Sequence, residues 1–165
     1  MVFALAMTEI EAPPEGTRGA GGIIDHQLTF KIQYLLHVPV YRLTGGIIGH
    51  RIGKITTLLL TTTGAKSGLP RTLGLNYRRD GDNFVVVASK GGATKHPLWF
   101  RNLLKTPKCE VQVGRQKLHC RARIATAAER PRLWELMTEN YPGYNGYQKA
   151  TDREIPLVIL EPNPA

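Results

Sequence analysis

The sequence predicts a mainly β protein of the α+β class, in which short strands form a barrel with a few peripheral helices. Runs of β-branched and apolar residues at 55–63 and 83–89 have the length and composition of buried strands. Asp80-Gly81 lies just before the second run and is a strong hairpin-turn signal. Apolar and polar residues alternate from 117 to 124, as on a strand with one buried face. Short strands joined by hairpin turns are typical of an antiparallel barrel.

The remaining elements can be placed in chain order. Thr126 and Glu129 form a capping-box pattern that indicates the start of a helix, and Pro131 predicts an irregular first turn for it. We also expect strands at 71–78, 109–113 and 155–160, a loop at 90–97 and a short helix at 98–104.

The N-terminal part of the chain is predicted to differ from the barrel. Residues 1–22 are expected to be a flexible leader, because they are rich in proline, glycine and glutamate. Residues 23–165 are predicted to form one domain that begins with a helix at 23–41, which Pro39 should end or kink. A glycine-rich loop at 45–49 follows. The helix either plugs the barrel or acts as a lid or membrane-surface contact that delivers an apolar acceptor.

The charge of the chain indicates an acidic partner. Its 165 residues carry a formal net charge of +9, which leaves nucleic acid, an anionic membrane surface and a phosphorylated small molecule open. The basic residues are spread over strands and loops, which argues against a nucleic-acid arm. No apolar run approaches the roughly 20 residues that cross a bilayer, so we expect a cytoplasmic protein, with membrane association left open.

Neither a metal site nor a covalent nucleophile is indicated. Cys109 and Cys120 form no CxxC pair and have no histidine at a metal-ligand spacing, so buried reduced thiols are expected. The sequence also has no HExxH and no GxSxG motif. A redox activity would therefore need a bound cofactor.

Two basic loops could hold an anionic cofactor. The first, 66–71, offers two cations, a hydroxyl group and a turn with free backbone N–H groups. The second, 89–97, has paired glycines that let the backbone approach a ligand, and a helix begins behind it. Taken alone, either loop also fits an ordinary solvated hairpin turn. Each one follows a strongly apolar strand, as expected for loops at the rim of a barrel.

The tyrosine-rich segment 141–147 is a third candidate. Its tyrosines at three-residue spacing, with glycines between them, make a poor core helix and suit either an aromatic pocket or a surface turn. Trp99 is either a wall of the same pocket or part of the core. His96 precedes a proline at a helix start, which fits a structural role better than a titrating one.

Together these residues resemble the deazaflavin-dependent nitroreductase family, over a match that spans 41–162. The segments that carry the resemblance, in chain order, are 58–64, 66–71, 88–102, 141–147 and 151–156. The resemblance implies a split β-barrel. It also implies reduced coenzyme F-420, a deazaflavin with a phosphate and a polyglutamate tail, as the hydride donor, with FMN less favoured. The acceptor would be a small organic molecule, either a quinone, an activated ene or a nitroaromatic.

The resemblance also implies a role for each candidate residue. Tyr141, Tyr144 and Tyr147 would line the acceptor side and, with Ser89, act in catalysis. The residues that would hold the phosphate and the tail are Lys66, Ser67, Gly68, Pro70 and Arg71. The residues that would surround the deazaflavin and its linker are Ala88, Ser89, Lys90, Gly91, Gly92, Ala93, Lys95, Leu98 and Trp99.

Two positions depart from the family pattern. Ala65 stands where relatives often have a second basic residue, which predicts weaker tail binding. Asn76 stands where some nitro-reducing relatives have an aromatic residue, which argues against nitroimidazole reduction. The alternative function is a barrel that binds a deazaflavin, flavin or lipid without catalysis. A nucleic-acid-binding barrel is disfavoured because no stacking ladder is evident, and the oligomeric state stays open.

Overall fold

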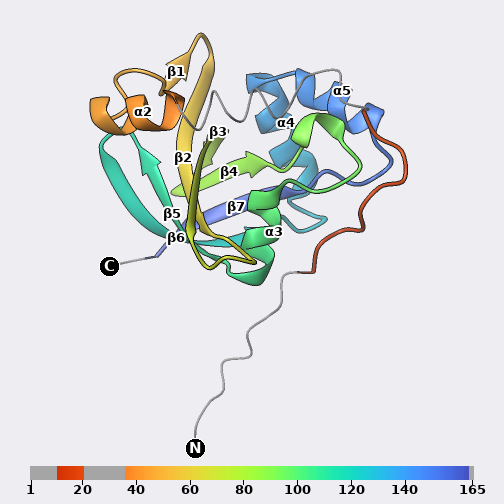
Figure 1. The fold of residues 1–165 in the computed structure, drawn as a ribbon. Helices are drawn as coiled ribbons and strands as arrows, with labels where there is room; N and C mark the ends of the chain where they lie inside the picture. Colours follow the sequence, from red (N-terminus) through yellow and green to blue (C-terminus); the bar gives the residue numbers. More distant parts are fainter. Residues whose placement is uncertain (1–10, 21–35, 164–165) are drawn as a thin grey trace, which may run out of the picture.

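The computed structural model describes residues 11–20 and 36–163, which contain a closed antiparallel barrel (Figure 1). Its strands pair in the order β2-β3-β4-β7-β6-β5, and β5 pairs back onto β2 to close it. A short strand, β1 (Arg51–Ile52), adds to the outer edge of β2. The six strands of the barrel are β2 (Ile55–Thr63), β3 (Pro70–Asp80), β4 (Asn83–Val87), β5 (Lys108–Val113), β6 (Gln116–Ile124) and β7 (Leu157–Pro162).

The observed strands confirm the predicted mainly β barrel, and their ends lie within two residues of the predicted ones. The predicted hairpin between β3 and β4 is also confirmed. Asp80 pairs with Asn83, so the turn between them contains only Gly81 and Asp82. Gly81 has a φ of +60°, in the left-handed region that glycine adopts without steric cost.

Alternation along the strands separates two hydrophobic cores. Phe84 and Val86 of β4 point into the barrel and belong to its main core. Val85 and Val87 lie on the other face of β4, where they pack in a second core that includes Tyr144. The helices of the C-terminal half therefore cover the outer face of β4 and β7.

Helices surround the barrel in the part of the chain that the structure describes. Figure 1 shows α4 and α5 together on one side of the barrel and α2 on another. Three residues of α3, Trp99, Phe100 and Leu103, belong to the main core. No described helix is long and apolar enough to cross a membrane. The helices are α2 (Val38–Thr44), α3 (Leu98–Lys105), α4 (Arg130–Asn140) and α5 (Gly143–Ala150), with a 3-10 turn, η2, at Lys90–Gly92.

Within the described residues Pro39 does not end a helix. Pro39 lies in the first turn of α2, which continues past it to Thr44 and ends at Gly45 in the left-handed conformation. A proline is tolerated in a first turn because the N–H that it lacks would have no partner within the helix. The rest of the predicted helix, residues 23–35, lies outside the described residues.

Pro131 lies in the first turn of α4, and the residues between Thr126 and Arg130 form a turn rather than regular helix. The capping box is confirmed just before this helix. The Thr126 N–H donates to Glu129 Oε2 at 2.8 Å, and the Glu129 N–H donates to Thr126 Oγ1 at 3.3 Å. These reciprocal bonds satisfy N–H groups that have no partner within the helix.

The tyrosine-rich segment is helical from Gly143 as α5, although its glycines predicted a poor core helix. Tyr144 is only 5% exposed, and its burial in the second core outweighs the low helix propensity of the glycines. Gly143 is needed for packing, because a Cβ there would lie 2.6 Å from the Tyr141 ring.

Residues 11–20 lie against the barrel, which differs from the flexible leader predicted for 1–22. The Gly16 N–H donates to the Thr94 carbonyl at 2.9 Å, and the Ala20 N–H donates to the Gly92 carbonyl at 2.9 Å. The hydroxyl and the N–H of Thr17 both donate to the carboxylate of Asp152. Residues 1–10 and 21–22 of the predicted leader lie outside the described residues.

Candidate functional site

The loop after β4 has a backbone suited to binding an anion. The backbone of Ser89 has the right-handed helical conformation. Lys90, Gly91 and Gly92 have φ values of +47°, +61° and +77°, in the left-handed region. Within residues 11–20 and 36–163, the N–H groups of Ser89, Lys90 and Gly91 make no hydrogen bond. Consecutive free N–H groups in a turn of this kind form a nest that binds a phosphate or a carboxylate. A left-handed lysine is strained, and such strain concentrates at functional sites.

Arg153 lies beneath this nest and fixes its shape. The side chain is 2% exposed, and its guanidinium donates to the carbonyl oxygens of Ala93 at 2.7 Å, Ser89 at 2.6 Å and Ala88 at 3.2 Å. Burial lowers the pKa of Arg153 from its ordinary value, but an arginine remains charged at neutral pH. A buried positive charge therefore lies under the nest and strengthens its attraction for an anion.

His96 connects Arg153 to the N-terminal segment. Arginine can only donate, so the 3.3 Å contact between Arg153 Nη1 and His96 Nδ1 makes Nδ1 the acceptor. The other nitrogen, Nε2, then donates to the Pro13 carbonyl at 2.8 Å. Burial is the largest cause that lowers the pKa of His96, so the imidazole is neutral at pH 7. His96 thus has the structural role expected from its position.

The turn between β2 and β3 is held from inside by α3. The Asn102 amide donates to Thr62 Oγ1 at 3.0 Å, and its Oδ1 accepts the Ala65 N–H at 2.9 Å. Lys105 donates to the Ala65 carbonyl at 2.7 Å. The predicted tail-binding residues of this turn are all exposed: Lys66, Ser67, Gly68, Pro70 and Arg71.

Helix α3 brings the two predicted loops to the same side of the barrel. The nest loop leads into its first residues, and Asn102 and Lys105 in its second half bind the β2–β3 turn. Eight helical residues span only about 12 Å, so one elongated anion could reach both loops. Leu98 is exposed between them, whereas Trp99 is buried in the main core, as one of its two interpretations expected.

The three predicted tyrosines meet in one cluster beside the nest. The ring centroids of Tyr141 and Tyr144 are 5.0 Å apart, and the hydroxyl groups of Tyr141 and Tyr147 are 3.0 Å apart. A Cβ at Gly92 would lie 2.7 Å from the Tyr147 carbonyl oxygen, so only glycine allows the nest to pack against α5.

Tyr144 reaches across from α5 to β3. Its hydroxyl group is hydrogen-bonded to the side chain of Asn76, the position where the family pattern is broken. Burial raises the pKa of Tyr144 to about 12, so the phenol stays protonated at neutral pH. The structure therefore joins the predicted acceptor side to the outer face of β3.

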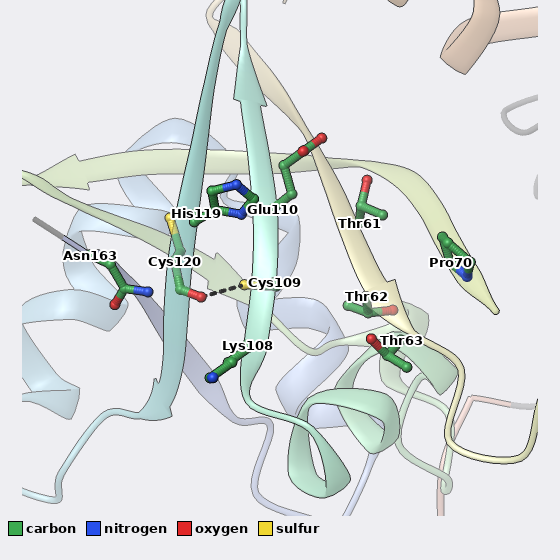
Figure 2. A pocket seen from close by; sticks show the side chains of 10 residues that line it. All are labelled: Thr61, Thr62, Thr63, Pro70, Lys108, Cys109, Glu110, His119, Cys120 and Asn163. Carbon is green, nitrogen blue, oxygen red and sulfur yellow. Dashed lines mark hydrogen bonds between the residues drawn. The ribbon is translucent and has the colours of Figure 1, made fainter. Parts of the chain in front are cut away.

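One surface hollow in the described residues lies on the strands next to the β2–β3 turn. Figure 2 shows this hollow of about 400 Å³ on β2, β5 and β6, and Pro70 is the one predicted site residue that lines it. Cys109 and Cys120 lie opposite each other there, and both are free thiols as expected. Burial raises the pKa of Cys109 to about 12 and that of Cys120 to about 11, so neither thiol is reactive at neutral pH.

A closed antiparallel barrel with an anion nest, a basic turn and an aromatic cluster on one side suits an oxidoreductase that holds an anionic cofactor. Among the described residues, no group of three or more His, Cys, Asp or Glu side chains could hold a metal ion. The chain matches the model of the F420H(2)-dependent quinone reductase family over residues 33–162, and it belongs to that family.

Individual relatives agree with this assignment. The chain is 45% identical over 129 residues to an F420H(2)-dependent quinone reductase of Mycobacterium tuberculosis, covering 76% of this chain and 87% of the relative. A solved F420-H2 dependent reductase, FDR-A, is 43% identical to this chain with a TM-score of 0.60. The match covers 64% of this chain and 93% of the FDR-A chain. A solved domain-swapped dimer is 35% identical to this chain with a TM-score of 0.63. The match covers 82% of this chain and 99% of the other. The split-barrel fold and the F-420-dependent reductase class are confirmed.

Two residues of the site had no role in the sequence interpretation. Arg153 and Asn102 appeared there only as members of motifs that carried the resemblance. No local pattern distinguishes a buried arginine from an exposed one. The nearest signal was the run Thr151-Asp152-Arg153 before a strand, and all three of its residues contact the nest loop or the N-terminal segment.

Proposed function

We propose that this chain binds reduced coenzyme F-420 along the loops at the two ends of α3 and reduces a small quinone. The observation that carries the proposal is the nest, whose three N–H groups have no partner among residues 11–20 and 36–163 and lie above the buried charge of Arg153 and beside the tyrosine cluster. The residues fit this cofactor. The free N–H groups lead us to assign the phosphate to the nest rather than, as the resemblance implied, to the 66–71 turn, while the polyglutamate tail would meet the exposed cations Lys66 and Arg71.

Reduced F-420 supplies a hydride, so a quinone that accepts this hydride and one proton becomes a hydroquinone. The family name and the names of the relatives support a quinone as the acceptor. Tyr144 suits the acceptor side, because a phenol that remains protonated can donate a hydrogen bond to an oxygen on which negative charge develops. Asn76 orients that phenol through the hydrogen bond between the two side chains.

Titration of the purified protein with reduced F-420, FMN and NADPH, followed by a menadione turnover assay, tests the proposal. We expect F-420 to bind most tightly, because FMN has a single phosphate and would use fewer of the cations. Tighter or equal binding of FMN would contradict the cofactor assignment. Tight binding of F-420 without menadione reduction would favour the non-catalytic barrel instead.

We also propose that the protein is cytoplasmic and touches the membrane surface through α2 and the loop after it. Leu43 is 88% exposed and Ile47 is 78% exposed, and Leu36 and Ile48 add to the same apolar surface. The net charge of +9 favours an anionic bilayer. Flotation with phosphatidylglycerol vesicles should recover the native chain but not a Leu43→Ser/Ile47→Ser variant. Equal recovery of the two would exclude this contact.

A further inference from the structure

A second hollow, of about 260 Å³, lies between the β1–β2 turn and the C-terminal end of α4. Arg51 and Lys54 line it from the hairpin that β1 forms with β2, and Arg78 lines it from β3. Glu139 and Asn140, the last two residues of α4, complete its wall. Three cations thus face one carboxylate, so the hollow has an excess of positive charge.

The polar groups of this hollow lack partners in the described part of the chain. None of its three cations forms an ion pair with a described residue, and neither does Glu139. Asn140 is 8% exposed, and its buried Nδ2 makes no hydrogen bond. A buried amide donor is normally satisfied, because an unmade hydrogen bond costs free energy. An amide donor beside unpaired cations is the composition of a site for an oxyanion.

The hollow adjoins the acceptor side of the site. Arg78 lies two residues after Asn76, so both side chains project from the same face of β3, roughly 7 Å apart along the strand. Asn76 holds the hydroxyl group of Tyr144, and Asn140 directly precedes Tyr141 in the chain. A molecule bound against the tyrosine cluster could therefore extend a side group into the hollow.

We propose that this hollow binds an oxyanion, such as a carboxylate or a sulfonate, carried by the hydride acceptor itself. The proposal rests on the proposed function and narrows its substrate class to ring compounds with an acidic side group. The carboxylates of the cofactor tail are a poorer occupant. Arg71, where the cofactor tail is placed, lies at the N-terminal end of β3. It is seven residues from Arg78, roughly 23 Å away along the strand.

A matched pair of acceptors tests the charge requirement. One is a naphthoquinone with a propanoate side chain, and the other is its methyl ester, which has the same ring and no charge. We expect the KM of the acid to be at least tenfold below that of the ester in the native protein. The variant Arg51→Gln/Arg78→Gln should lose this preference while its KM for the ester stays unchanged, which also shows that the variant is folded.

The variant Lys108→Gln/Arg121→Gln is the control for net charge. It removes two cations from neighbouring exposed positions on β5 and β6, outside the hollow, and should keep the full preference for the acid. Equal KM values for acid and ester in the native protein would overturn the proposal. A loss of preference in the control as large as in the Arg51/Arg78 variant would also overturn it, because the effect would then be one of overall charge.

Calorimetry with 1-naphthylacetate, in the absence of any cofactor, separates this proposal from the proposed function. Binding that depends on Arg51 and Arg78 supports the hollow even if no quinone is reduced. Reduction of the ester without preference for the acid would support the proposed reductase function and overturn the proposed anion site in the hollow. If inorganic sulfate displaces 1-naphthylacetate at similar concentration, the site takes free anions and the assignment to the acceptor is wrong.

Asn140 offers a second, independent readout. Asn140→Leu removes the unpartnered amide, so the free protein should gain thermal stability while its affinity for 1-naphthylacetate falls severalfold. Unchanged affinity would show that the amide does not contact the anion and would overturn its part in the site.

Discussion

The guanidinium of Arg153 donates a 2.6 Å hydrogen bond to the carbonyl oxygen of Ser89, although 64 residues separate them in the chain. The same guanidinium holds the carbonyls of Ala88 and Ala93, so one buried side chain determines the direction of the peptide groups in the nest. Because these carbonyls turn towards Arg153, the neighbouring N–H groups remain available to a ligand.

Replacement of Arg153 by methionine should therefore affect both stability and binding. The three carbonyls would lose charge-assisted hydrogen bonds, and we expect a loss of about 3 kcal/mol in the free energy of unfolding. Arg153→Lys should recover only part of it, because an ammonium group cannot span three carbonyls as a planar fork does. Urea unfolding measures the stability and titration with F-420 the affinity. A methionine variant with native affinity would show that the nest keeps its shape without Arg153.

Lys90 combines a cation with a strained backbone, and two substitutions separate these properties. Both Lys90→Ala and Lys90→Gly remove the charge, so they should weaken F-420 binding equally. Only glycine relieves the φ of +47°, so the glycine variant should be more stable than the alanine variant by about 1 kcal/mol. Thermal unfolding and calorimetry of the pair measure this. Different affinities for the two variants would mean that backbone conformation, not charge, determines binding.

The pH dependence of stability should reveal His96. Its pKa is lowered in the folded protein, chiefly by burial, so in the acid range the unfolded chain binds more protons than the folded one. The contribution of His96 to the free energy of unfolding is therefore fully present above the pKa of the unfolded chain, about 6.5. It decreases as the pH falls towards and through the lower pKa of the folded protein. Melting temperatures between pH 7.5 and pH 5 should fall less for His96→Gln than for the native chain. Parallel curves would contradict this role.

Tyr144→Phe tests the acceptor side. The change removes the hydroxyl group bonded to Asn76 and should lower kcat for menadione by about 100-fold, the usual effect of losing one such donor. Because burial raises the pKa of Tyr144 to about 12, its ionisation should not reduce the native rate up to pH 10. Binding of F-420 should be unchanged. A variant with the native kcat would exclude Tyr144 from the reaction.

Lys66→Ala and Arg71→Ala test the tail contacts. Each should weaken F-420 binding and flatten its salt dependence, because exposed charges interact through screened forces. Turnover at saturating cofactor should stay nearly native, as expected when uniform binding is lost. Lys108→Ala, at an exposed position on β5, is the matched control. A collapse of turnover with unchanged affinity for F-420 would instead place the two cations beside the deazaflavin ring of the cofactor.

Strand positions could be predicted well because alternation and turn residues are local signals. The β2–β3 and β3–β4 hairpins follow directly from their apolar runs and glycines. Helix α5 could not be predicted, because burial of Tyr144 against Val85 and Val87 overrides the glycines of that segment. In the candidate site, the basic and glycine-rich loops could be found from the sequence by residue type. The contacts of Arg153 and Asn102 depend on the folded arrangement, which joins residues 37 to 65 positions apart.

Closure of the barrel also constrains how copies of this chain can associate. Pairing of β5 with β2 occupies the backbone groups that an open sheet would present at its margins. The additional strand β1 has two residues, which is too short to template another molecule. Pairing between whole strands of two copies is thereby disfavoured. A second copy must instead engage side-chain surfaces or exchange a segment, as the domain-swapped relative does.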